Sequence, residues 1–346
     1  MPEGSSFLPT AWFIVLSFML TGYAVLDGYD LGVGALHLFT GRSDRSREMA
    51  IDAIGPVWNG NEVWLLAAGG SMIAAFPHLY ASAFSGFYLA LMLVLWLLVL
   101  RGLSIEFRHQ VHHAIWTDAW DVGFAVGSIL LAVLLGAALG NVLRGVPLQE
   151  DGSFQGSFAL LLNPFALLCG VLSLVTLSMH GAAYLAMKVS GELQARASRL
   201  VIPLWVGTVA LLVAVVAASF VVQPAFTANF QRWPLLAVFP LIAIAAAAAI
   251  PVMHRAGRDG AAFGASATLI AGTLASAAAG LYPRLLPALP GSAHPSLDIY
   301  NTASAPSSQA IALGIYLVGM AIVIVYMVNV YRVWRGRVGE EHTYQL

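Results

Sequence analysis

Long apolar runs separated by short polar stretches follow one another along the chain. A helix needs about 20 apolar residues to cross the hydrocarbon core of a bilayer. Runs of this kind occur nine times, at residues 8–38, 60–77, 79–104, 119–143, 160–187, 198–221, 234–253, 261–282 and 307–332. The pattern therefore predicts an all-α polytopic membrane protein with nine transmembrane helices in a single membrane domain, residues 1–346.

The polar stretch after the first run is predicted to form an amphipathic helix at the membrane surface, over residues 42–58. Apolar residues recur there at helical spacing, and charged residues occupy positions between them. The charged residues are Arg45, Arg47, Glu48 and Asp52, and the apolar ones are Met49, Ile51, Ile54 and Val57.

Composition supports a membrane protein and excludes several kinds of site. Of the 346 residues, 59% are hydrophobic and 10% are charged, whereas soluble domains carry about 25% charged residues. The net charge of -1 gives no basic surface for nucleic acid. Cys169 is the only cysteine, which excludes an internal disulfide and an iron–sulfur cluster held within the chain.

Lysine and arginine fall mostly on one side of the predicted helices. With the N-terminus outside, thirteen of the sixteen lie in inner loops, at inner helix ends or in the tail. The other three are Arg144, Arg232 and Arg284. Because positively charged loops stay in the cytoplasm, we predict the N-terminus out and the C-terminus in, in a bacterial inner membrane.

A stripe of polar residues interrupts the lower half of the first apolar run. Asp27, Asp30, Gly34 and His37 are spaced three, four and three residues apart, which places them on one face of a helix. Ionisable residues inside a membrane segment are costly and indicate function. The alternative is that they lie among lipid headgroups and are simply solvated.

More polar residues gather at the predicted cytoplasmic ends of the first four helices. One-sided carboxylates of this kind suit proton uptake from the cytoplasm, and function is favoured for Asp30 and Glu106. For Glu62, Asp118 and Asp121, pairing with Arg101 and Arg108 at the interface is an equal alternative. The further polar residues of this set are Asn59, Asn61 and Arg101.

A haem held by this chain alone is not expected. Haem needs an axial ligand such as histidine facing a cavity, and only His180 lies deep in a predicted span. A lone intramembrane histidine is more often a hydrogen-bonded packing residue. We therefore predict no metal site and no cofactor bound by ligands of this chain.

Several motifs resemble subunit II of the cytochrome bd-type quinol oxidases. One is Gly-Tyr-Asp-Leu-Gly-Val-Gly at 28–34, and another is the stretch 55–65, which includes Trp-Asn-Gly-Asn-Glu-Val-Trp at 58–64. The similarity covers essentially the whole chain, through 83–88, 101–108, 120–121, 140–147, 162–165, 181–185 and 300–304. The compact length resembles the cyanide-insensitive branch of the family.

The resemblance implies a heterodimer that oxidises quinol and reduces dioxygen to water. Subunit I would carry haem b, haem d and the quinol site, so this chain would not be catalytic alone. A small single-helix subunit joins some complexes. The implied architecture is two four-helix bundles, over 8–143 and 160–282, plus a peripheral helix at 307–332.

The resemblance also implies a proton channel from the cytoplasm toward haem d. Its acids are similar to Asp30 and Glu106, while a family position that is often Asp is Asn59 here. Because Asn cannot ionise, a relay there would use water or Glu62. The full predicted path is Asp30, Glu106, Asn59, Glu62, Asp27 and Asp121, and the predicted structural quinone site or oxygen route is at Trp64 and Arg101.

Two other functions fit the same residues. A proton-coupled secondary transporter would use the acids for coupling, but would need broken helices at mid-membrane. A quinone-binding membrane anchor of another respiratory enzyme would be accompanied by iron–sulfur centres rather than haem d.

Overall fold

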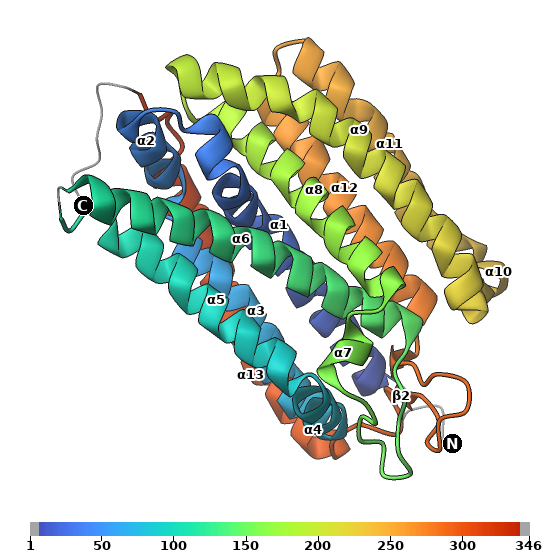
Figure 1. Cartoon of the computed structure of the whole chain (residues 1–346). Coiled ribbons are helices and arrows are strands. Elements are labelled where there is room, and N and C mark those ends of the chain that lie inside the picture. The colour runs from blue at the N-terminus through green and yellow to red at the C-terminus, as the bar shows by residue number, and fades with distance from the viewer. Residues whose placement is uncertain (1–6, 112, 340–346) are drawn as a thin grey trace.

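The computed structural model describes residues 7–111 and 113–339, and nearly all of its regular elements are helices (Figure 1). In chain order they are α1 (Phe7–Thr40), α2 (Asp44–Ile54), α3 (Trp58–Ala75), α4 (Pro77–Gly86), α5 (Tyr88–Phe107), α6 (Ala114–Arg144), α7 (Phe158–Leu161), α8 (Pro164–Lys188), α9 (Gly191–Val222), η2 (Pro224–Thr227), α10 (Ala228–Arg232), η3 (Pro234–Ala237), α11 (Val238–Arg255), α12 (Asp259–Leu281) and α13 (Pro306–Val333). The short strands β1 (Arg284–Leu286) and β2 (Leu297–Asp298) pair antiparallel.

Within residues 7–111 and 113–339, eight helices are long and apolar enough to cross a membrane, which agrees with the predicted class of protein. They are α1, α5, α6, α8, α9, α11 with the preceding η3, α12 and α13. The predicted count was nine. The difference is the run 60–77. Most of it lies in the 18-residue helix α3, which begins with the polar sequence Trp-Asn-Gly-Asn-Glu.

The predicted span 79–104 is not one helix, because the chain breaks at Phe87 between α4 and α5. Gly86 lies at this break against the ring of Phe154. A Cβ atom on Gly86 would come within 2.3 Å of Phe154 Cβ. The loop after α6 therefore packs so closely against the break that only glycine fits.

α1 lies between two groups of helices. It packs against α3 and α6 on one side and against α8 and α12 on the other, while α11 and α12 pack together and α13 lies against α3 (Figure 1). The crossing of α1 with α8 is very close at Gly32 and Gly181. A Cβ atom on Gly32 would lie 1.9 Å from the Leu177 carbonyl oxygen, so a side chain there would separate the helices.

The two ends of the molecule differ in structure (Figure 1). One end carries α2, and we call it the α2 end; the other carries α4, α7, the strands and the start of α1. Helix α2 occupies part of the predicted surface helix 42–58 and begins with a capping box at Ser43. Its apolar residues Met49, Ile51 and Ile54 are buried against protein.

Asp52 on α2 is partly buried beside this core. Burial, and to a lesser extent the charge of Glu48, raises the pKa of Asp52 to about 6 from the usual 3.8. The folded state therefore binds this proton more tightly than the unfolded state. The resulting stabilisation is present below about pH 4 and is lost as the pH rises through about 6.

Asp52→Asn is accordingly expected to raise the free energy of unfolding at pH 8 by on the order of 1 kcal/mol, after allowance for screening by solvent. At pH 4 the variant and the parent should have the same stability. Thermal unfolding of the purified protein at both pH values measures the difference. Glu150→Gln in an exposed loop is the matched control, and an equal gain at both pH values would contradict the assignment.

Candidate functional site

The first polar cluster has a buried ion pair at its centre. Asp27 on α1 and Arg101 on α5 have no exposed surface. Arg101 Nη1 donates to Asp27 Oδ2 at 2.8 Å, and Arg101 Nη2 lies 2.7 Å from Asp27 Oδ1. Glu62 on α3 adds a second carboxylate, with Oε2 3.6 Å from Arg101 Nη2. Three helices are thus joined by one guanidinium.

Asp30 lies one helical turn from Asp27 and is bound by Asn61 of α3. Asn61 Nδ2 donates to Asp30 Oδ2 at 2.8 Å, and both residues are fully buried. The same Nδ2 lies 2.7 Å from the Tyr29 hydroxyl, and Tyr331 of α13 donates to Asn61 Oδ1 at 3.1 Å. Asp30 Oδ1 has no hydrogen-bond partner among the described residues, so this oxygen is available to a proton.

The balance of charged groups in this cluster favours proton chemistry. One guanidinium contacts the carboxyl groups of Asp27 and Glu62, and a third carboxyl group, that of Asp30, lies one helical turn from Asp27. Carboxyl groups in excess of their cation, buried at membrane depth, are typical of proton-binding sites. We define the Asp30 cluster as Asp27, Asp30, Glu62 and Arg101 together with Asn61, Tyr29 and Tyr331.

A second cluster lies nearer the α2 end and is centred on Asp121 of α6. Asp121 Oδ1 accepts from His37 Nε2 at 2.6 Å and from Arg108 Nε at 2.7 Å. Arg47 Nη1 lies 3.2 Å from Asp121 Oδ2. The two arginines have further partners: Arg108 Nη2 lies 2.6 Å from Asp44, and Arg47 Nη1 lies 2.9 Å from Asp118. These contacts tie α1, α2 and the loop after α5 to α6.

The structure brings some predicted path residues together and leaves others apart. Asp27, Asp30 and Glu62 meet in the Asp30 cluster, while Asp121 belongs to the second cluster. Asn59 and Glu106 are exposed and belong to neither. The site also contains Asn61 and Tyr331, which the predicted path did not include.

Trp64 and Arg101, the predicted quinone or oxygen residues, are both buried. The Trp64 ring packs against Gly22, where a Cβ atom would lie 2.3 Å from it. Trp64 Nε1 and Arg101 Nε are buried N–H donors without a hydrogen-bond partner among the described residues. A carbonyl oxygen can accept from a donor of either kind.

Across residues 7–111 and 113–339, no group of three or more His, Cys, Asp or Glu side chains is arranged to hold a metal ion. His180 is buried and serves packing contacts. Its Nε2 lies 3.0 Å from the Val25 carbonyl oxygen, and its ring stacks on Phe263. His180 therefore joins α1, α8 and α12.

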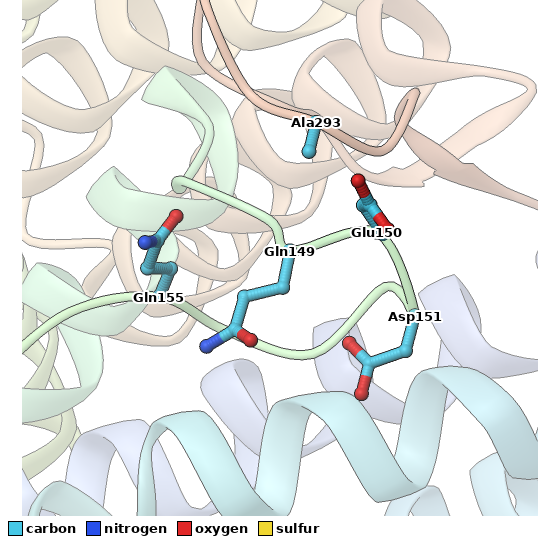
Figure 2. A pocket seen from close by; sticks show the side chains of 5 residues that line it. All are labelled: Gln149, Glu150, Asp151, Gln155 and Ala293. Atoms are coloured by element: carbon cyan, nitrogen blue, oxygen red, sulfur yellow. The ribbon is translucent and has the colours of Figure 1, made fainter.

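A surface hollow lies among the loop after α6 and the loop between β1 and β2 (Figure 2). It is lined by Gln149, Glu150, Asp151, Gln155 and Ala293. Gln149 follows the end of α6 at Arg144, whereas Asp121 lies near the start of that helix. The rise of an α-helix puts about 35 Å between Asp121 and Arg144, so the hollow is separate from the cluster around Asp121.

Comparison with known proteins gives concordant matches over nearly the full length. The model of the family "Cytochrome bd terminal oxidase subunit II" matches residues 8–334. A Haemophilus influenzae protein described as "Probable cytochrome oxidase subunit 2" is 36% identical, over 95% of this chain and 93% of its own length. The Bacillus subtilis "Cytochrome bd ubiquinol oxidase subunit 2" is 31% identical, over 95% of this chain and 96% of its own.

The fold has a counterpart among solved structures. A chain in the structure of bd oxidase from Geobacillus thermodenitrificans superposes with a TM-score of 0.78, covering 94% of this chain and 98% of that one at 18% identity. The relatives span this chain from the first helix to the last, as the resemblance in its motifs predicts. The chain therefore belongs to the cytochrome bd terminal oxidase subunit II family.

Proposed function

We propose that this chain is the haem-free subunit of a quinol oxidase that supplies protons from the cytoplasm to the site of dioxygen reduction. Subunit I would hold haem b, haem d and the quinol site, and this chain would stabilise it. The observation that carries the proposal is the Asp30 cluster. It places the buried carboxyl groups of Asp27 and Asp30 and the half-buried one of Glu62 near one guanidinium, and Asp30 Oδ1 has no hydrogen-bond partner among the described residues.

The exposed residues of the predicted path fit a partner surface. Glu106 continues a stripe of exposed residues on α5 that includes Leu93, Trp96, Val99 and Leu103. A carboxylate on a stripe that faced lipid would be costly, which supports subunit I as the covering partner. Glu106 and Asn59 would then lie at the interface, with Asn59 acting through water. Glu62 would connect that interface to the buried cluster.

The orientation follows from charge. The α2 end carries most of the arginines, so we place it in the cytoplasm of a bacterial cell, with the protein in the inner membrane. The start of α1 would then lie outside. Asp121 and His37, nearer this end, would lie on the cytoplasmic side of Asp30.

The unpaired donors of Trp64 and Arg101 support a structural quinone near these residues. Either N–H group would donate to a quinone carbonyl. The family membership favours the oxidase over a transporter or an anchor for a different respiratory enzyme.

The test of the proton path is Asp30→Asn in the intact oxidase. We expect quinol-driven oxygen consumption to fall roughly tenfold or more, because the amide cannot carry a proton, with the haem content unchanged. Asp30→Glu keeps a carboxyl group and is expected to recover part of the rate. Glu150→Gln is the matched control. Parental turnover in Asp30→Asn with full haem content would rule out a path through Asp30.

A further inference from the structure

Three polar side chains from three helices meet beside Asp30. They are Tyr29 of α1, Asn61 of α3 and Tyr331 of α13. Asn61 Nδ2 lies 2.7 Å from the Tyr29 oxygen, the two tyrosine oxygens are 2.6 Å apart, and the Tyr331 oxygen lies 3.1 Å from Asn61 Oδ1. Tyr29 and Tyr331 are 302 residues apart in the chain.

With Nδ2 of Asn61 toward Asp30, the available protons determine the direction of each hydrogen bond. Asn61 Oδ1 is only an acceptor, so Tyr331 donates its single hydroxyl proton to Asn61 Oδ1. In the contact between the two tyrosines, Tyr29 must then be the donor. The Tyr29 oxygen in turn accepts from Asn61 Nδ2. The three groups thus form a closed ring in which each group donates to the next.

The ring leaves one proton of Asn61 Nδ2 pointing out of it. That proton reaches Asp30 Oδ2 at 2.8 Å, with the Leu26 carbonyl oxygen at 3.2 Å as a second acceptor. If the amide turned over, Oδ1 would face the Asp30 carboxyl and Nδ2 would face the Tyr331 hydroxyl. The tyrosine hydroxyls can close the ring in either direction, so it is the two acceptors, Asp30 Oδ2 and the Leu26 carbonyl oxygen, that select the orientation with Nδ2 toward Asp30. The ring then holds the amide in this orientation.

Tyr29 is held in place by other contacts, whereas Tyr331 comes from a weakly buried helix. The Tyr29 ring stacks on Tyr184, with 4.2 Å between centroids. Of the described residues of α13, only Gln309 and Met327 are buried. The hydroxyl of Tyr331 is thus the group through which α13 acts on the cluster.

We propose that Tyr331 is a positioning residue for Asp30: its hydroxyl closes the ring that holds the Asn61 amide with Nδ2 toward the Asp30 carboxyl. This inference rests on the proposed role of Asp30 as a proton carrier. It gives α13 a part in the site that its peripheral place in the fold does not suggest. Tyr331 neither contacts Asp30 directly nor carries the proton.

The experiment uses Tyr331→Phe in the purified oxidase with all its subunits. The infrared bands of the Asp30 carboxyl group, identified as those lost in Asp30→Asn, are expected to shift because the amide donor is no longer fixed. Oxygen consumption is expected to fall about fivefold, the effect of losing one typical hydrogen bond. Tyr326→Phe is the matched control, because Tyr326 lies on the same helix and is exposed. It should change neither quantity.

Asp30 bands that stay unchanged in folded Tyr331→Phe would overturn the proposal. If Tyr331→Phe does not assemble, Tyr29→Phe breaks the same ring at another member and should give the same shift; unchanged bands there would overturn the proposal equally. The proposed proton path can be contradicted independently of the ring. Full activity in Asp30→Asn together with shifted bands in Tyr331→Phe would remove the path and leave the ring in place.

Discussion

Replacing Arg101 by methionine is expected to lower the free energy of unfolding by about 3–5 kcal/mol. Methionine fills much of the same volume, but it leaves the Asp27 carboxylate buried without its cation. Arg101 holds this carboxylate through two close contacts, at 2.8 and 2.7 Å, and both residues are fully buried. The loss is large because the charge that remains has no access to water.

A double variant separates the cost of an unpaired charge from the loss of packing. Asp27→Asn combined with Arg101→Met removes both charges and is expected to recover most of the stability lost in the single variant. Thermal unfolding of the detergent-purified complex measures the stability of the single and the double variant. A double variant no more stable than Arg101→Met would show that packing around Arg101, rather than the ion pair, is what matters.

Asp121→Asn is expected to destabilise the α2 end by about 2–3 kcal/mol. The carboxylate accepts from His37, Arg108 and Arg47, and it has no exposed surface. The neutral amide can satisfy only part of this set. The effect should be smaller than that of Arg101→Met, because the two arginines keep Asp44 and Asp118 as partners.

Asp118→Asn is the control for this cluster. Asp118 also pairs with Arg47, but its side chain is 68% exposed. Exposed ion pairs contribute about 0–1 kcal/mol, so this variant should unfold close to the parent temperature. Equal destabilisation by the Asp118 and Asp121 variants would contradict the central role of Asp121.

The spacing of the α1 stripe predicted a shared face, and the structure divides that face between two sites. Asp27 and Asp30 belong to the Asp30 cluster, whereas His37 is bound by Asp121. Spacing along one helix shows which residues lie on the same side, but not which neighbouring helices they meet. Which carboxylate each arginine pairs with therefore came only from the packing of the helices.

Tyr331 shows a different limit of sequence reasoning. A tyrosine near the end of an apolar span is typical of the aromatic belt at a membrane surface, and no local pattern links it to Tyr29. Asn59 and Glu106 show the reverse case. Their motifs suggested the path, yet both are exposed in the single chain. Helical periodicity cannot distinguish a face that meets a partner from one that meets lipid.

Hydropathy predicted the membrane class and most helix positions, but it missed local breaks. The run 79–104 is continuous in hydropathy, although α4 ends at Gly86. At the break Gly86 packs against Phe154, which comes from a loop more than 60 residues later in the sequence. Contacts of this kind have no signature in a window of 20 residues.

The most direct test of the account is a reduced-minus-oxidised visible spectrum of the gently solubilised, tagged protein, with mass spectrometry of the proteins that copurify. We predict a haem d band toward the red end of the visible range and one larger haem-bearing partner. A colourless, folded chain that elutes alone would contradict the assignment to a quinol oxidase complex.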